Sequence, residues 1–142
     1  MAVAEILAEK GGNVITIGPE TTLEDASKTL ANHKIGALVV VNEHDKVCGI
    51  VSERDIVRDI AKAGSGALMK PVSDCMTHRV ISCSSDDLVD TLMEKMTAGK
   101  FRHLPVIDNG ALKGIISIGD VVKRKIEQAE RDAEEMKRYI AG

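Results

Sequence analysis

Two stretches of the chain each end a short apolar run with a serine and place an aspartate three residues later. Gly49–Asp55 reads GIVSERD, and Gly114–Asp120 reads GIISIGD. Each predicts a strand that ends at the serine and a helix that follows, so a hydroxyl, free backbone N–H groups and a carboxylate meet at one junction. The N–H groups and the helix dipole suit a phosphate, and the carboxylate can accept both hydroxyls of a ribose. This chemistry favours a nucleotide site without a catalytic group.

A helix cap is the alternative interpretation of the same residues. Ser-x-x-Asp before an apolar helical pattern is also a capping box, whose only role is to satisfy the unpaired N–H groups of the first turn. Either stretch by itself would more often be a cap than a binding site. The site interpretation therefore depends on whether the rest of the chain repeats around the two stretches.

The elements around the two stretches occur twice in the same order. Short apolar runs predict strands, and apolar residues at helical spacing predict helices. In the first copy we expect strands at Val14–Ile17, Ala37–Val41 and Val47–Ser52, and helices from Thr21 and Glu53. In the second copy we expect strands at Val80–Cys83, Leu104–Ile107 and Leu112–Ser117, a helix capped by Ser85, and a helix from about Asp120. Asn109-Gly110 is a strong signal for a hairpin turn between the last two strands.

The register of the two copies is nearly constant. Val41 and Ile107 are 66 positions apart. Ser52 and Ser117 are 65 positions apart. One residue is therefore lost in the hairpin turn, where a deletion is tolerated best. We conclude that the chain is an internal duplication of a β-α-β-β-α unit.

Composition limits the classes of partner. The 142 residues are 44% hydrophobic and 29% charged, which is enough for an aliphatic core and a soluble surface. Only 1% are aromatic, and the net charge is −3 with no basic block, which counts against nucleic acid as the main partner. The chain has no apolar run of membrane-spanning length and no signal-peptide pattern.

The cysteines predict a reducing environment. Cys48, Cys75 and Cys83 are odd in number and lie in or beside apolar runs, as expected for free thiols in a cytoplasmic protein. Cys75 and Cys83 lie close in sequence to His78, but a fourth ligand at structural-zinc spacing is missing. We therefore expect no metal site.

The duplicated unit resembles a tandem pair of cystathionine-β-synthase (CBS) domains. The resemblance rests on Ile35–Val41 (IGALVVV), Ser52–Asp55 (SERD) and Phe101–Val106 (FRHLPV), which are similar to stand-alone bacterial members of that family. It implies an α/β (α+β) fold in which two β-α-β-β-α repeats pack with pseudo-twofold symmetry and a C-terminal helix follows. The expected organisation is an N-terminal segment 1–13, repeat 1 at 14–63, a linker 64–79, repeat 2 at 80–126 and a helical tail 127–142.

The resemblance also implies two clefts, each built from both repeats. In each cleft the aspartate would hold the ribose, aliphatic strand residues would enclose adenine, and basic residues with the helix N-terminus would meet phosphate. The implied residues of the first cleft are Thr16, Ile35, Gly36, Ala37, Ser117, Gly119 and Asp120. Those of the second cleft are Ser52, Arg54, Asp55, Ser82, Phe101, Arg102 and His103. Arg54, Arg102 and His103 predict that the second cleft carries more positive charge than the first.

The expected function is a non-catalytic regulatory sensor of an adenosine-containing ligand such as AMP, ATP or NAD(H), which would change shape or assembly on binding. The alternative is a structural or partner-docking domain with vestigial clefts. An enzymatic function is disfavoured, because the sequence has no nucleophile–base pair, metal constellation, Walker-type loop or sign of a catalytic cofactor. The protein that it would regulate is not indicated by the sequence.

The tail predicts self-association. After Asp120, apolar residues recur at alternating spacings of 4 and 3, which is a heptad pattern. The residues of this seam are Val122, Ile126, Ala129, Ala133, Met136 and Ile140. With the resemblance, the seam predicts a homodimer. The alternative is an amphipathic helix that lies back on its own domain.

Overall fold

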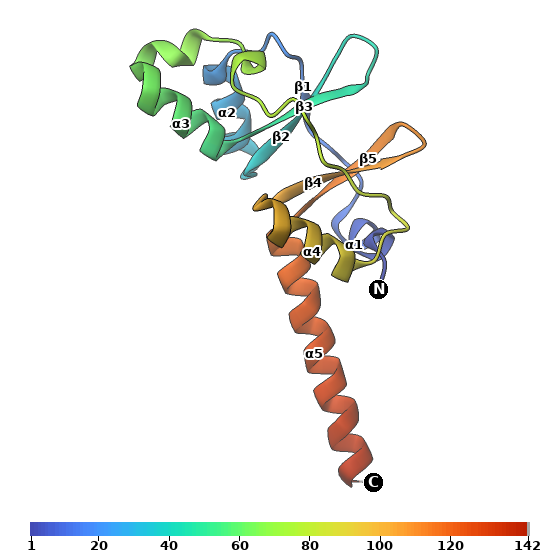
Figure 1. Cartoon of the computed structure of the whole chain (residues 1–142). Helices are drawn as coiled ribbons and strands as arrows, with labels where there is room; N and C mark the ends of the chain where they lie inside the picture. Colours follow the sequence, from blue (N-terminus) through green and yellow to red (C-terminus); the bar gives the residue numbers. More distant parts are fainter. Residues whose placement is uncertain (142) are drawn as a thin grey trace.

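Each repeat forms a small β-sheet with helices packed against it (Figure 1). The computed structural model describes residues 1–141. In the first repeat, β1 (Thr16–Ile17) pairs parallel with β2 (Ala37–Val41), and β2 pairs antiparallel with β3 (Val47–Ser52). Helices α2 (Leu23–His33) and α3 (Glu53–Ala63) complete this unit. The second repeat contains α4 (Val89–Gly99), the antiparallel hairpin of β4 (His103–Asp108) and β5 (Ala111–Ser117), and α5 (Ile118–Ala141). The predicted α+β duplication is confirmed.

The helices of the first repeat begin at side-chain caps. Thr22 Oγ1 accepts a hydrogen bond from the backbone N–H of Asp25, so α2 is capped by Thr22 and not by the predicted Thr21. Ser52 caps α3 in a complete capping box with Asp55. The first strand is shorter than predicted, because only Thr16 and Ile17 pair with β2.

Two predictions for the second repeat are wrong. Val80–Cys83 is not a strand, since only Cys83 bridges to Val106 of β4. The next hydrogen bond of a parallel ladder would need the N–H of residue 105, which is Pro105 and has none. Ser85 does not cap α4, because its N–H donates to Asp108 at 3.0 Å and the helix begins only at Val89. The last helix starts at Ile118, slightly before the predicted Asp120.

The segment that precedes each repeat packs on the other repeat. Helix α1 (Val3–Lys10) contributes Val3 and Ile6 to the core of the second repeat. The linker forms two short 3₁₀ helices, Gly64–Met69 and Val72–Asp74, and contributes Val72 to the core of the first repeat.

Equivalent hydrogen bonds hold both segments. The N–H of Val3 donates to the carbonyl of Asp87 at 2.8 Å. The N–H of Val72 donates in the same way to the carbonyl of Thr21 at 2.7 Å. Val3 therefore corresponds to Val72, and the pseudo-twofold relation includes the exchanged segments.

Helix α5 continues well beyond the body of the second repeat (Figure 1). Positions 129–141 are all exposed, so the alternative in which the tail lies back on its own domain is not what the structure shows. Within residues 1–141, no helix combines the length and the apolar character that crossing a membrane requires.

Candidate functional site

A cleft of about 350 Å³ lies between the two repeats. That volume is within the usual range for small-molecule sites. Aliphatic side chains and part of β2 form much of its wall, and polar groups come from α1, β4, β5 and the segments that follow α1 and α2. The lining residues are Lys10, Asn13, Val14, Ile15, Lys34, Ile35, Gly36, Ala37, Val39, His103, Ile115 and Ser117.

The cleft brings together four residues predicted for the first site, namely Ile35, Gly36, Ala37 and Ser117. Ala37 begins β2 and Ile35 lies two residues before it, whereas Ser117 ends β5, so both repeats contribute. Thr16, Gly119 and Asp120 lie outside this lining. Thr16 and Gly119 are exposed, and Asp120 lines a smaller hollow beside Lys10 and Arg124.

The junction at Ser117 has the expected strand-to-helix geometry. The Ser117 N–H donates to Asp120 Oδ2 at 2.8 Å, and the Asp120 N–H donates to Ser117 Oγ at 3.2 Å. The reciprocal bonds form a capping box, so the cap interpretation is confirmed. The carboxylate has additional accepting capacity, and capping does not preclude a second role.

Lys10 is the principal partner of the Asp120 carboxylate. Its Nζ lies 2.7 Å from Asp120 Oδ2 and also donates to the Ile115 carbonyl at 2.8 Å. Burial by itself would raise the pKa of Asp120, but the hydrogen bonds from Lys10 and Ser117 and the charge of Lys10 hold it below its usual value. Asp120 is therefore ionised at neutral pH and can accept hydrogen bonds.

Asp55 stands at the equivalent junction of the first repeat. Its Oδ2 accepts from the N–H and the hydroxyl of Ser52 at 2.9 and 3.0 Å. Its Oδ1 lies 3.4 Å from the guanidinium of Arg58, a residue on the next turn of α3. The local cation beside Asp55 therefore comes from its own helix, whereas that beside Asp120 comes from the exchanged segment.

His103 lines the first cleft, although the resemblance implied it for the second. A Cβ atom on Gly36 would stand 3.3 Å from His103 Nε2 and 3.7 Å from Glu53 Oε1, so Gly36 allows the two repeats to approach. Burial lowers the pKa of His103, the charges of Lys10 and Arg102 lower it further, and Glu53 and Asp120 oppose this. His103 is therefore neutral at pH 7.

The remaining predicted residues of the second site have different surroundings. Arg54 and Arg102 are exposed. Phe101 packs against the core of the second repeat, where it lies against Gly99. The carbonyl of Ser82 accepts a hydrogen bond from Lys95 at 3.4 Å. Phe101 therefore has a structural role in addition to any contact with a ligand.

Sequence reasoning missed two basic residues of the first cleft, Lys10 and Lys34. Their two ammonium groups give this cleft a positive charge that positions 36, 37 and 119 did not predict. Lys34 follows α2 in the left-handed conformation, with a φ of 54°. Lys10 could have been found by aligning the two segments that precede the repeats, because it corresponds there to Arg79.

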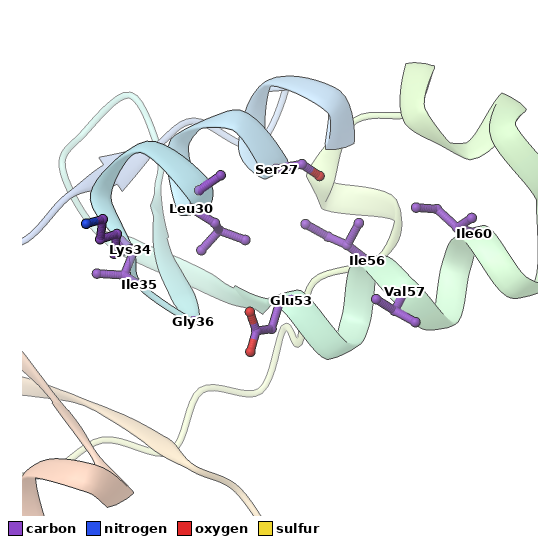
Figure 2. A pocket seen from close by; sticks show the side chains of 10 residues that line it. Ser27, Leu30, Lys34, Ile35, Gly36, Glu53, Ile56, Val57 and Ile60 are labelled. Atoms are coloured by element: carbon purple, nitrogen blue, oxygen red, sulfur yellow. The ribbon is translucent and has the colours of Figure 1, made fainter.

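A second hollow, of about 550 Å³, lies between α2 and α3. Figure 2 shows Ser27 and Leu30 of α2 on one side and Ile56 and Ile60 of α3 on the other. Val57 is 65% exposed at this groove. The groove is an open, mainly apolar surface, and its charged lining residues are Lys34 and Glu53.

Two of the three cysteines, Cys75 and Cys83, are poorly suited to nucleophilic catalysis. Burial raises the pKa of Cys75 to about 11, and it also raises that of Cys83 to about 11. Both thiols are therefore protonated and weakly nucleophilic at neutral pH. Among residues 1–141, no three histidine, cysteine, aspartate or glutamate side chains come together in a metal-binding arrangement.

Comparison with known proteins identifies the same duplication. The family model described as CBS domain matches residues 3–62 and again 72–127, so the two matches begin at the equivalent residues Val3 and Val72. The crystal structure of the CBS-domain containing protein ATU1752 from Agrobacterium tumefaciens is 48% identical, with a TM-score of 0.85, over 87% of this chain and 92% of that one.

Two similar structures contain adenosine compounds. The CBS domain pair of the protein MJ0100, in complex with 5′-methylthioadenosine and S-adenosyl-L-methionine, is 28% identical with a TM-score of 0.81 and covers 90% of this chain and 98% of that one. The CBS domain protein PAE2072 from Pyrobaculum aerophilum, complexed with AMP, is 27% identical with a TM-score of 0.76 and covers 84% of this chain and 89% of that one.

Proposed function

The chain belongs to the CBS domain family, and from this premise we propose that it is a non-catalytic regulatory module that binds an adenosine-containing ligand. AMP, ATP and NAD(H) are the ligands that we favour, and the clefts between the repeats are their sites. The complexes of MJ0100 and PAE2072 support the ligand class.

The observation that carries the proposal is the position of the Ser117–Asp120 junction beside the aliphatic cleft. Ile35 and Ile115 offer apolar walls to an adenine ring, and the ionised Asp120 offers an acceptor to a ribose diol. Lys10 and Lys34 supply positive charge for phosphate. Each part of a nucleotide therefore has a chemically matched group in or next to one cleft.

The Asp55 junction is the corresponding part of the second proposed site. It retains the serine, the capping box and the carboxylate, and Arg54 and Arg58 provide positive charge on the same helix. Ser82, Arg102 and Phe101 remain proposed contacts of this site. Because His103 lies in the first cleft, we assign it there.

Calorimetric titration with AMP, ATP and NAD⁺ tests the proposal. Asp120→Asn and Asp55→Asn keep a side-chain oxygen that can accept the serine N–H of the capping box but remove the negative charge. Each should weaken binding at its own site by about 1.5–3 kcal/mol per hydrogen bond lost, which is roughly 10- to 100-fold. Asp86→Asn, at an exposed position outside the cleft lining, is the matched control and should bind like the wild type. Unchanged binding in the double variant would contradict the site, and no binding by the wild type would favour the docking-domain alternative.

We also propose that the protein is a homodimer. Val57 of α3 and Val122 of α5 occupy equivalent positions in the two repeats and are 65% and 46% exposed. On the extended part of α5, Met136 and Ile140 are 58% and 77% exposed. This part of the heptad seam is therefore not buried by any other segment within residues 1–141. A second copy of the helix would cover it.

The charges beside the seam favour a parallel pair of helices. In the heptad pattern, Asp132 of one copy would face Lys137 of the other when the helices are parallel. In an antiparallel pair with the same apolar overlap, Asp132 would face Asp132 and Glu130 would face Glu130. Like charges at these flanking positions are unfavourable, so the parallel arrangement is the one that we propose.

A further inference from the structure

The ion pair between Lys10 and Asp120 occupies the same carboxylate that the proposed function gives to the ribose. Lys10 Nζ contacts Asp120 Oδ2 at 2.7 Å and the Ile115 carbonyl at 2.8 Å. The pair is only partly screened from water, since the side chain of Lys10 is 37% exposed and that of Asp120 is 23% exposed. A ribose that takes both acceptor positions of Asp120 must therefore compete with the Lys10 ammonium.

The backbone of Lys10 is held while its side chain can move. Val3 and Ile6 anchor α1 in the core of the second repeat, with 0% and 5% of their surfaces exposed. Lys10 is the last residue of α1, and Gly11 turns the chain with a φ of 94°. A long flexible stem at a fixed point allows the ammonium to leave Asp120 and still remain in the cleft that it lines.

A phosphate would compensate for the displacement of Lys10, whereas an uncharged nucleoside would not. When the ammonium leaves the carboxylate, a phosphate in the same cleft offers it a second anionic partner. Adenosine would displace the Lys10 ammonium from the Asp120 carboxylate without offering it another anionic partner. Lys34 is also in the cleft lining, but it makes no ion pair with Asp120, so its contribution to phosphate binding requires no such exchange.

We propose that Lys10 is the residue that makes the first cleft select nucleotides over nucleosides, because its ammonium exchanges the Asp120 carboxylate for the ligand's phosphate. This inference rests on the proposed function and adds a specificity determinant to it. It applies to the first cleft alone, since Asp55 pairs with Arg58 of its own helix and not with Arg79, the equivalent of Lys10.

The test is calorimetric titration with AMP and with adenosine in an Asp55→Asn background, so that the first cleft dominates the signal. With Lys10 present, AMP should bind more tightly than adenosine. In Lys10→Met, which removes the charge and keeps most of the stem, AMP should bind about tenfold more weakly, as expected for one lost charge-assisted hydrogen bond. Adenosine should bind equally well or better, because its competitor is gone. The ratio of the two affinities should therefore fall, a change that general damage to the cleft would not produce.

Two further variants complete the experiment. Lys10→Arg keeps the positive charge and should retain the preference for AMP, while Lys62→Met, at an exposed position on α3, should leave both affinities unchanged. If AMP binds and the affinity ratio is the same in Lys10→Met as in the parent, the role of Lys10 is refuted and the proposed function stands. If neither compound binds to the parent or to the wild type, the proposed function fails and the role of Lys10 fails with it.

Discussion

Replacing Val3 with alanine should destabilise the second repeat, although sequence analysis places Val3 outside both repeats. Val3 has 0% of its surface exposed and belongs to the same apolar cluster as Leu92 and Ile116. Val→Ala removes two buried methyl groups, which is about 1.6 kcal/mol at roughly 0.8 kcal/mol per buried carbon. The cavity left behind adds to this, so we expect a loss of about 2 kcal/mol in the free energy of unfolding.

The structure supplies a matched partner for this substitution. Val72 is the equivalent residue in the linker, also has 0% of its surface exposed, and belongs to the core of the first repeat. Val72→Ala should therefore lower stability by a similar amount, in the other unit. Glu5→Ala, at an exposed position on α1, should change stability by no more than about 0.5 kcal/mol.

Urea unfolding gives the magnitude, and native-state amide exchange gives the location. Val3→Ala should accelerate exchange in β4 and β5, whereas Val72→Ala should accelerate it in β2 and β3. A loss below about 0.5 kcal/mol in Val3→Ala, which is the range of ordinary surface substitutions, would refute the packing of α1. Faster exchange confined to β2 and β3 would instead show that α1 is associated with the first repeat.

Two other expectations concern pH and assembly. Burial chiefly lowers the pKa of His103 below 6.5. As the pH falls, the unfolded chain therefore protonates this imidazole at a higher pH than the folded protein does. Urea unfolding should therefore show stability falling from about pH 7 to about pH 5.5, and falling less in His103→Gln; equal losses would contradict this. In a parallel dimer, Ala133 lies level with its copy, so Ala133→Cys should form an intermolecular disulfide under mild oxidation. Glu134→Cys, on an outer face of the helix, should not, and equal cross-linking of both variants would refute the parallel seam.

The parts of the fold that sequence could predict are those whose causes are local. Ser52 and Asp55 are three positions apart, and their reciprocal bonds depend only on the first turn of α3. Asn109-Gly110 determines the turn between β4 and β5 in the same way, with φ values of 50° and 80°. The serine and the aspartate recur 65 positions later at Ser117 and Asp120, and this spacing gave the register of the duplication.

The contacts that sequence could not predict join distant segments. Lys10 and Asp120 are 110 positions apart, and the cation beside Asp120 depends on α1 packing on the second repeat. The prediction of a strand at Val80–Cys83 failed because the partner strand contributes Pro105, a defect that is visible only when the two strands are aligned. His103, which the resemblance implied for the second cleft, lines the first, because proximity in sequence to Arg102 does not determine which side of the interface a β4 side chain lines.

Helix α5 connects the first cleft to the proposed dimer seam. Asp120 lies in its first turn and binds Lys10, and one turn later Arg124 binds the Glu5 carbonyl and the Glu9 carboxylate at 3.1 and 3.0 Å. Both contacts attach α5 to α1. If a nucleotide draws Lys10 away from Asp120, the first of these contacts is lost while Arg124 still holds the helix. The buried Val121 and the Lys125–Asp90 ion pair also hold the start of α5 on the second repeat. We therefore expect the loss of the first contact to shift the helix slightly, and the seam farther along the same helix would shift with it. Ligand binding and assembly would therefore be coupled through one continuous helix, which gives the module a physical means of regulation.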